Sequence, residues 1–365
     1  MPGVYISYPF CNQKCSFCNF SSGVSPFETR ARYHRALLNE IRAWEWNWAP
    51  ETVYFGGGTP SLMPEELLSE LMKLIPGERL TEVTLECAPG TITAQTIETW
   101  GNCGVNRVSL GVQSFVASEL RITGRRHDAS TVGSEVRLLR EGGIRNINID
   151  LIAGLPKQNV DSWDDSLRWI ERLAPPHVSV YIFEIDEDSR LGKEIILGGS
   201  RYGAKQVPDD DLTAELYERA VERLAKLGLE RYEISNFARP GWESRHNLKY
   251  WRLEPYVGFG LDAHSYDGRN RWNNPDTIGE YFARQNSGTS AMSNRIEIDP
   301  HEERFFVGLR LMSGIEPTAE EWSRFAQPIE KHLRDGMLER AGGRLRLSQR
   351  AVLVSNEIFE DFVHA

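Results

Sequence analysis

The sequence contains no long apolar run and no excess of basic residues. No stretch of its 365 residues is apolar over the roughly 20 positions needed to cross a bilayer, and the first residues lack the basic and then apolar segments of a secretory signal. Acidic residues outnumber basic ones by 52 to 42, which gives a net charge of −10 and argues against a nucleic acid held on a basic face. We therefore expect a cytoplasmic protein without a membrane span and without a nucleic-acid partner.

Cysteine is also scarce, and internal repeats and low-complexity tracts are absent. Of the five cysteines, Cys87 and Cys103 stand alone and do not suggest the disulfide framework of a small secreted protein. The chain is longer than one average domain, so we expect a large α/β domain with a smaller appendage.

The other three cysteines, Cys11, Cys15 and Cys18, lie within eight positions with the spacing C-x3-C-x2-C. Three thiolates so close together can bind one cubane iron–sulfur cluster and leave one iron open, whereas a structural zinc site normally has a fourth Cys or His nearby, and none follows here. Zinc, or three unrelated cysteines, remain the less favoured alternatives.

Six segments alternate apolar and polar residues and predict strands with one apolar and one polar face. They lie around Val4–Ile6, Val53–Phe55, Val83–Cys87, Val108–Val112, Ile147–Leu151 and Val178–Ile182. Helical patterns fill the gaps, with apolar residues over 33–48, 67–74, 132–139, 167–173 and 211–227. This alternation predicts a parallel sheet. Because the inward faces would be polar, we expect a wide, incomplete barrel of six strands around a wet cavity over residues 1–228.

The remaining sequence divides into two further segments. Residues 229–298 are irregular, aromatic and polar, and we expect an extension of the barrel there. Residues 299–365 predict a small α+β domain of winged-helix type, with a hairpin from Leu338 to Leu347 that turns at Gly342-Gly343. Its mixed charges favour packing or partner binding over DNA reading.

Several polar residues stand where the predicted strands end, and parallel-strand enzymes place their chemistry at that edge. The run Gly56-Gly57-Gly58-Thr59-Pro60 would let the backbone approach a ligand closely. Glu86, Gln113 and Asp150 lie on the polar faces of three successive strands and suit ribose hydroxyls and a cationic ligand. Arg125 could pair with a carboxylate, and Tyr5 faces the same side just before the cysteines.

The cysteine spacing resembles the signature of radical S-adenosylmethionine (SAM) enzymes. The whole set resembles the family of oxygen-independent coproporphyrinogen III dehydrogenases and their HemW-type heme-chaperone relatives, with Asn148–Pro156 similar to the family's fifth-strand motif. The resemblance implies a partial (β/α)6 barrel and a [4Fe-4S] cluster on Cys11, Cys15 and Cys18, which reduces SAM to a 5′-deoxyadenosyl radical. Carried over by motif, the SAM contacts are Tyr5, Phe17, Gly57, Gly58, Thr59, Glu86, Gln113, Arg125 and Asp150.

Three features favour the HemW-type branch. Phe20 stands where the dehydrogenases usually carry a fourth cysteine, and the chain begins almost on the first strand. Residues 246–251 match the motif H-N-x-x-Y-W associated with heme binding, which implies heme contacts at His246, Asn247, Tyr250 and Trp251. Imidazole is a good iron ligand, and Tyr and Trp rings stack on porphyrins. By spacing alone, His246 is more often structural.

The chain also departs from the family pattern. Ser7-Tyr8 replaces the His-Ile that usually precedes Pro-Phe-Cys, which puts a proton-relay or porphyrin role at position 7 in doubt. The segment Gly258–Tyr266 resembles a glycine-rich family segment whose function the residues do not reveal. His264 within this segment could contact heme or substrate, although a structural role is more common for such a residue.

The resemblance implies a heme chaperone that holds heme for an acceptor hemoprotein, with an electron donor for its cluster, acting as a monomer or homodimer. Whether the chain is an enzyme stays open, because an oxygen-independent coproporphyrinogen III dehydrogenase of porphyrin biosynthesis, or another radical SAM enzyme, is the alternative. A third hypothesis is a binding module whose cluster regulates assembly without SAM cleavage.

Overall fold

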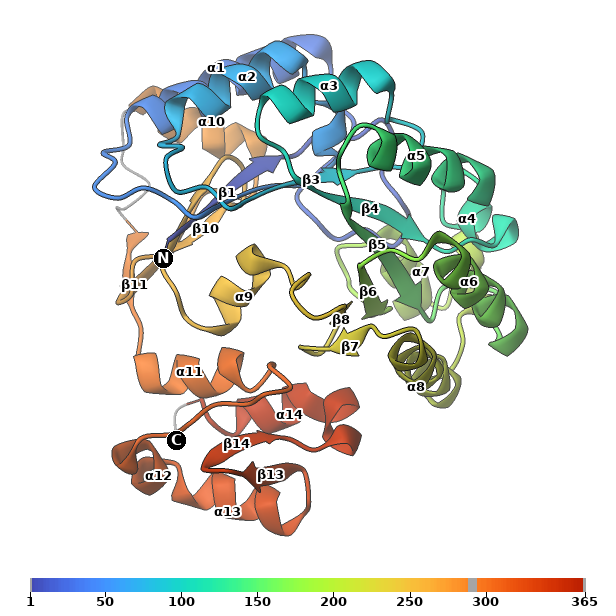
Figure 1. Ribbon diagram of the computed structural model, residues 1–365, viewed down its shortest axis with the longest axis vertical. Coiled ribbons are helices and arrows are strands. Elements are labelled where there is room, and N and C mark those ends of the chain that lie inside the picture. The colour runs from blue at the N-terminus through green and yellow to red at the C-terminus, as the bar shows by residue number, and fades with distance from the viewer. Residues whose placement is uncertain (1, 288–293, 364–365) are drawn as a thin grey trace.

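The computed structural model describes residues 2–287 and 294–363, and the six predicted strands form one curved parallel sheet (Figure 1). The strands lie side by side in the order of the chain. They are β1 (Gly3–Tyr8), β2 (Thr52–Gly57), β3 (Glu82–Cys87), β4 (Arg107–Gln113), β5 (Asn146–Ala153) and β6 (His177–Ile182). The predicted partial barrel is confirmed.

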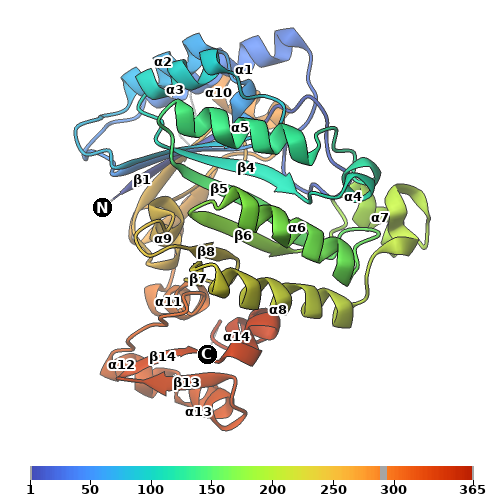
Figure 2. The ribbon, with the colours of Figure 1, turned by 45° about the vertical axis from the view of Figure 1, so that its right-hand side comes forward.

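Helices cover the outer face of this sheet (Figure 2). They are α1 (Phe27–Arg42), α2 (Glu65–Leu74), α3 (Ala94–Asn102), α4 (Ala117–Ile122), α5 (Ala129–Glu141), α6 (Val160–Leu173) and α8 (Asp210–Lys226), with the short elements η1 (Pro60–Leu62), α7 (Arg190–Ile196) and η2 (Arg201–Gln206) between them. The apolar strand residues, such as Val53 and Phe55, are fully buried in the core that these helices complete. Asp209 caps α8, since its carboxylate accepts a hydrogen bond from the Leu212 N–H (2.9 Å).

The first helix is shorter than its apolar pattern predicted. It ends at Arg42, so Trp44 and Trp48 follow the helix. Trp44 packs edge-on against Phe259, with 5.8 Å between ring centroids, because the aromatic pattern continues into a loop that the core also buries.

The segment 229–298 is more regular than expected and extends the sheet at both edges. At one edge, β8 (Asn236–Ala238) pairs antiparallel with β6 and also with β7 (Glu230–Arg231). At the other edge, β9 (Tyr256–Phe259) pairs parallel with β1 and is followed outward by β10 (His264–Tyr266), β11 (Asn270–Asn273) and β12 (Ile296–Glu297). The segment also contains α9 (Arg245–Trp251) and α10 (Ile278–Ser287). These strands have two to four residues, too few to show a clear alternation.

The concave face of the sheet is polar, as the strand pattern predicted, and its side chains bond to one another. Asn148 donates to Asp150 (2.7 Å) and to the hydroxyls of Ser109 (2.7 Å) and Ser179 (2.9 Å). Figure 1 shows α9 beside this concave face, so helix and polar network together fill part of the space expected to be wet.

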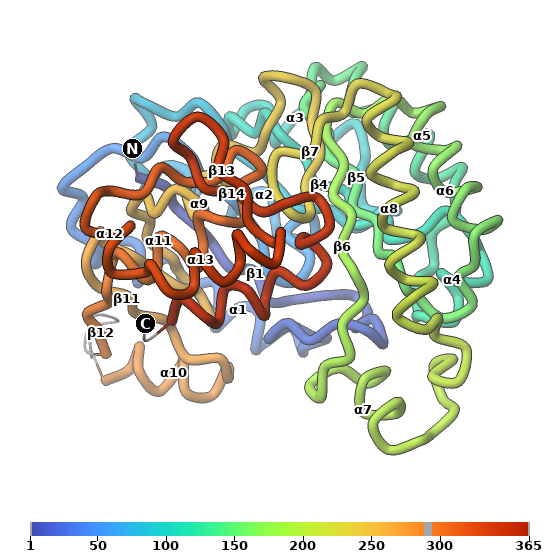
Figure 3. The backbone as a smooth tube through the Cα atoms, turned by 90° about the horizontal axis from the view of Figure 1, so that it is seen from below, coloured from blue at the N-terminus to red at the C-terminus, as the bar shows by residue number. Residues whose placement is uncertain are grey.

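The C-terminal residues pack around a second apolar cluster that includes Phe305, Phe325 and Phe359. The elements are α11 (Pro300–Gly308), α12 (Ala319–Arg324), α13 (Ala326–Arg334), the predicted hairpin of β13 (Leu338–Ala341) and β14 (Arg344–Leu347), η4 (Gln349–Val354) and α14 (Ser355–Glu360). Seen from below, they lie in front of α9 and β1 (Figure 3). The division of the chain at residues 228 and 298 stays a prediction. Within the described ranges, no helix combines the length and apolarity needed to cross a bilayer.

Candidate functional site

The three clustered cysteines lie on a loop that leaves the carboxyl end of β1. Two backbone hydrogen bonds close this loop, from Cys11 N–H to Gly23 O and from Gly23 N–H to Pro9 O, both 2.9 Å. Cys11 is 8% exposed, while Cys15 and Cys18 are half-buried. Burial raises the pKa of the Cys15 thiol, Arg125 opposes this shift, and Cys18 and Cys11 add to it. The three sulfurs and the Arg125 guanidinium therefore share one neighbourhood.

The loop offers three thiols as possible metal ligands. In the part of the chain that the structure describes, no three His, Cys, Asp or Glu side chains converge closely enough for one metal ion. Zinc needs its thiolates about 2.3 Å away from one centre, whereas a cubane binds each thiolate through a different iron atom.

The glycine-rich run after β2 packs directly against the cysteine loop. A Cβ atom at Gly58 would lie 2.8 Å from Pro9 C, 2.9 Å from Phe10 N and 2.9 Å from Tyr8 O, so only glycine fits there. The next residue, Thr59, donates its N–H to Phe10 O (3.0 Å) and its hydroxyl to Cys11 Sγ (3.4 Å). The two motifs therefore form one continuous wall at the carboxyl edge of the sheet.

Glu86 is a buried carboxylate beside this wall. It accepts hydrogen bonds from the Tyr54 hydroxyl (2.7 Å) and from the Gly57 N–H. Burial raises the pKa of Glu86 from 4.5 to about 7, and the charge of Asp150 adds to this shift. Tyr5 stacks on Tyr54, with 6.1 Å between ring centroids. A bound cation would therefore favour the ionised form of a carboxyl that is otherwise half-protonated near neutral pH.

Gln113 and Arg125 lie together on the far side of the site. A Cβ atom at Gly111 would lie 3.2 Å from Gln113 Nε2 and 3.4 Å from Arg125 Nη2, so both side chains converge over this glycine. Gln113 follows a β-bulge and has a left-handed φ of 72°, a strained conformation for a residue with a side chain. The Arg125 guanidinium lies 6.0 Å from the Phe17 ring centroid.

These two side chains also have atoms without a partner. Within the described residues, Gln113 Oε1 and Arg125 Nε are buried and form no hydrogen bond. Buried polar atoms are rarely left so in a complete structure. The structure thus brings Gln113 and Arg125 together, with atoms that a polar ligand can satisfy.

Asp150 lies on β5, opposite Gly111 of β4. It accepts hydrogen bonds from Asn148 Nδ2 (2.7 Å) and the Ser109 hydroxyl (3.1 Å), and burial raises its pKa.

Arg107 is a further charged residue of the barrel interior that the sequence reading did not include in the site. It is 1% exposed, its Nε has no hydrogen-bond partner within the described ranges, and its charge lowers the pKa of both Glu86 and Asp150. The signal in the sequence is its place on the polar face of β4, two residues before Ser109.

His246 lies at the opposite edge of the sheet. Its Nδ1 is 2.8 Å from the hydroxyl of Thr52, the first residue of β2, and its Nε2 is 2.8 Å from the Tyr250 hydroxyl. Its backbone N–H donates to the Glu82 carboxylate (2.9 Å) at the start of β3. Burial lowers the pKa of His246 to about 3, with Lys249 and Arg107 contributing, so the ring is neutral. Both ring nitrogens are occupied, and the residue is 1% exposed.

The other motif residues surround His246 on α9. Tyr250 contacts His246 edge-on, with 5.2 Å between ring centroids, and Asn247 lies in the first turn, where its N–H donates to the Ser244 hydroxyl (3.3 Å). Trp251 packs under the Arg310 guanidinium, 4.8 Å from the ring centroid. The motif therefore joins the barrel to the C-terminal elements, and the structure does not bring it to the cysteine loop.

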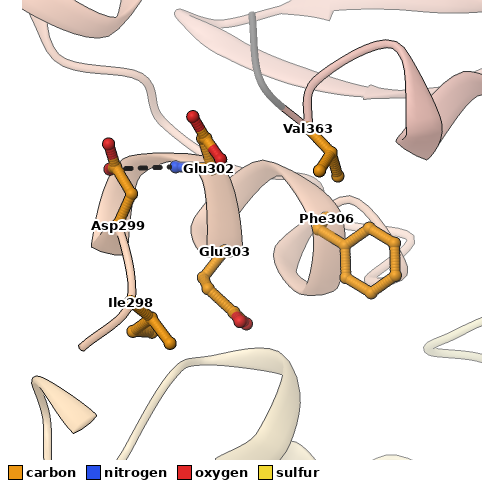
Figure 4. Close-up of a pocket in the computed structure, with 6 residues that line it drawn as sticks. All are labelled: Ile298, Asp299, Glu302, Glu303, Phe306 and Val363. Atoms are coloured by element: carbon orange, nitrogen blue, oxygen red, sulfur yellow. Dashed lines mark hydrogen bonds between the residues drawn. The ribbon is translucent and has the colours of Figure 1, made fainter. Parts of the chain in front are cut away.

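A pocket of about 280 Å³ lies beside α11 (Figure 4). It is lined by Ile298, Asp299, Glu302, Glu303, Phe306 and Val363. Its carboxylates already have partners, because Asp299 and Glu302 pair with Arg324 and Glu303 pairs with Arg271. No predicted site residue lines it.

Comparisons with known proteins agree with this fold. The model of the radical SAM superfamily matches residues 5–170. The solved structure of coproporphyrinogen III oxidase (HemN) from Escherichia coli, described as a radical SAM enzyme, matches with a TM-score of 0.85. The match covers 100% of this chain and 90% of that chain at 22% identity, so it shows a shared fold.

Two curated relatives resemble this chain over nearly its whole length. The heme chaperone HemW of Lactococcus lactis is 30% identical over 376 residues, which cover 98% of this chain and 96% of the relative. The heme chaperone HemW of Bacillus subtilis is 31% identical over 381 residues, which cover 100% of this chain and 99% of the relative. With this identity, this coverage and the radical SAM fold, the chain belongs to the HemW family of radical SAM proteins.

Proposed function

We propose that this protein is a heme chaperone that contains one [4Fe-4S] cluster, binds SAM, and passes heme to an acceptor hemoprotein. The observation that supports it most is that the three-cysteine loop, the glycine-rich wall and the Gln113–Arg125 pair lie at one edge of the barrel in a member of the HemW family. We expect it to act in the cytoplasm, as a monomer or homodimer, with an electron donor for the cluster.

The cluster would be held by Cys11, Cys15 and Cys18. The fit rests on the donor set, since three thiols lie on one closed loop and Thr59 donates to the Cys11 sulfur. The bound cluster would supply the electron that radical SAM chemistry requires.

The residues of this chain would then bind and orient SAM. Gln113 Oε1 and Arg125 Nε offer one acceptor and one donor, and the Glu86 carboxylate offers a charge to the sulfonium or amino group. Gly57, Gly58 and Thr59 would let the ligand approach the backbone closely. Tyr5, Phe17 and Asp150 complete the proposed contacts.

Heme contacts at His246, Asn247, Tyr250 and Trp251 stay a prediction. For His246 to ligate iron, it would have to give up its bond to Thr52 or to Tyr250 and leave a buried site.

The alternative is an oxygen-independent coproporphyrinogen III dehydrogenase, whose relative from Escherichia coli has the same fold. The environment of Ser7 argues against it. Ser7 is 4% exposed, its carbonyl accepts a hydrogen bond from the Tyr33 hydroxyl (2.7 Å), and a Cβ atom at Gly57 would lie 3.0 Å from its Oγ. A serine cannot carry charge or act as an imidazole proton relay at this position.

One experiment separates the two functions. The cluster is reconstituted anaerobically, and two assays follow: transfer of heme to an apo-hemoprotein, and conversion of coproporphyrinogen III with release of 5′-deoxyadenosine. We expect heme transfer without conversion, and formation of protoporphyrinogen would overturn the chaperone proposal. A Cys11, Cys15 and Cys18 triple alanine variant should lose the cluster, whereas the control variant Cys103→Ala should keep it.

A further inference from the structure

One imidazole at the mouth of the barrel differs from all other described histidines. Of the seven histidines that the structure describes, only His264 is exposed, with 63% of its side chain open to solvent. By contrast, His246 and His177 are buried, and hydroxyl or amide groups occupy their ring nitrogens. An accessible imidazole can bind an external ligand without breaking a hydrogen bond in the core.

The turn before His264 lies at the same edge of the sheet as the cysteine loop. Because β9 runs parallel to β1, with Gly258 beside Tyr5, the chain leaves β9 at the carboxyl edge. A hydrogen bond and a charge effect connect this turn with the site. The Ser21 hydroxyl donates to Asp262 Oδ2 (3.0 Å), and the charge of Asp262 contributes to the raised pKa of Tyr5.

His264 lies on the concave face of the sheet. Side chains alternate along β10, so His264 shares its face with Tyr266, while Ser265 between them is fully buried and accepts the Gly258 N–H (2.9 Å). Tyr266 faces Tyr256, which packs on Tyr250 of α9, with ring centroids 6.5 and 4.6 Å apart. Tyr266 and Tyr256 are 3% and 7% exposed, so these rings are buried and only His264 on this strand is open to solvent.

The cysteine loop adds an apolar side chain on the same side. Phe20 precedes Ser21, and 64% of Phe20 is exposed. Since Ser21 bonds to Asp262, an exposed phenyl ring and an exposed imidazole lie on two adjoining segments of the mouth.

Asp262 lies beside the imidazole. Its Oδ1 lies 3.9 Å from His264 Nε2, which is beyond hydrogen-bond distance. Asp262 has a left-handed φ of 56°, unusual for a residue with a side chain, and the bond from its N–H to Pro275 O (2.9 Å) holds it there. Histidines that bind metals usually have a carboxylate or carbonyl partner on the other ring nitrogen.

We propose that His264 is the protein ligand of heme iron at the mouth of the barrel, next to the cysteine loop. This inference rests on the proposed function, since it names a residue that would hold the transferred heme. A neutral imidazole is a common axial ligand of heme iron. The position would also place the bound heme at an open edge, where an acceptor protein can reach it.

The test is a titration of ferric heme into the cluster-containing protein. Wild type is compared with His264→Ala and with the control His364→Ala, whose residue lies outside the described ranges. Absorption and electron paramagnetic resonance spectra report the axial ligand. We expect His264→Ala to lose the signal of imidazole-ligated low-spin heme and to bind heme about tenfold more weakly or worse. Free imidazole should restore the signal, and Asp262→Asn should retain it at lower affinity.

The outcomes distinguish the two proposals. If wild type binds heme and His264→Ala gives the same spectrum and affinity, or if only His364→Ala loses the signal, the inference about His264 is wrong while the chaperone proposal stands. If wild type binds no heme, the chaperone proposal fails. The cluster absorption and the thermal midpoint of each variant show whether it is folded, and His264→Gln provides a second variant at this exposed position.

Discussion

The replacement Gly58→Ala tests whether the glycine-rich run and the cysteine loop form one rigid unit. The added Cβ atom would lie 2.8 to 2.9 Å from three backbone atoms of Tyr8, Pro9 and Phe10. Backbone atoms cannot rotate away as a side chain can, so the two segments must separate. Such overpacking costs about 1–3 kcal/mol. At roughly 2–4 °C per kcal/mol, the thermal midpoint should fall by about 2–12 °C.

The same replacement should weaken SAM binding. Separation of the segments would lengthen the bonds from Thr59 to Phe10 O (3.0 Å) and to Cys11 Sγ (3.4 Å). We therefore expect the variant to retain less cluster and to bind SAM at least about tenfold more weakly, the equivalent of about 1.4 kcal/mol. Differential scanning calorimetry under anaerobic conditions measures the first effect, and isothermal titration with SAM measures the second.

Gly101→Ala is the matched control. Gly101 lies in α3, and no heavy atom stands within 4 Å of the Cβ that the replacement would add. Alanine in a helix is about 0.5–1 kcal/mol more favourable than glycine, so this variant should be as stable as wild type or more stable, with unchanged SAM affinity. A Gly58→Ala protein that matches the control in midpoint, cluster content and SAM affinity would refute the packing argument.

Three further predictions concern buried titratable and hydrogen-bonded groups. The pKa of Glu86 is about 7 in the folded protein and 4.5 in the unfolded chain, so this carboxyl should stabilise the SAM-free fold below pH 4.5 and lose about 3 kcal/mol of that stability as the pH rises to 7. Denaturation measured across this range should show a smaller loss of stability in Glu86→Gln. An identical pH dependence in the variant and in wild type would contradict this prediction. Removing the cation in Arg107→Met should raise the pKa of Glu86 and Asp150 further, so SAM affinity should fall at pH 7 and recover at pH 9. The control Arg107→Lys keeps the charge and should behave more like wild type. A loss of SAM affinity that is independent of pH would point to misfolding instead. His246→Ala removes two side-chain hydrogen bonds and a buried ring, so it should lower the free energy of unfolding by about 2–4 kcal/mol. Unfolding in urea measures this change. A variant with normal stability but no heme binding would show that His246 is a ligand rather than a structural residue.

The barrel could be predicted because its signals are local. Each of the six strands is long enough to show an apolar and a polar face, and each is followed by a helical pattern. The carboxyl ends of parallel strands meet at one edge, so the sequence places the glycine-rich run and Glu86 beside the cysteines before any coordinates are known. The strands β7 to β12 could not be found in this way, because they are short, and β8 and β9 join the sheet through distant partners, β6 and β1.

The sequence by itself determined the cysteine triad, the fold class and the set of polar residues at the mouth, since spacing and alternation along one chain are enough to place them. Only the tertiary structure decided which of the polar residues are free to act. It sealed His246 between Thr52 and Tyr250 at the amino edge of the sheet, and it brought Asp262 and His264 to the cysteine loop through the pairing of β9 with β1. The physical reason is that the contact of His246 with Thr52 and that of Asp262 with Ser21 join residues 194 and 241 positions apart, and no local sequence pattern records such contacts.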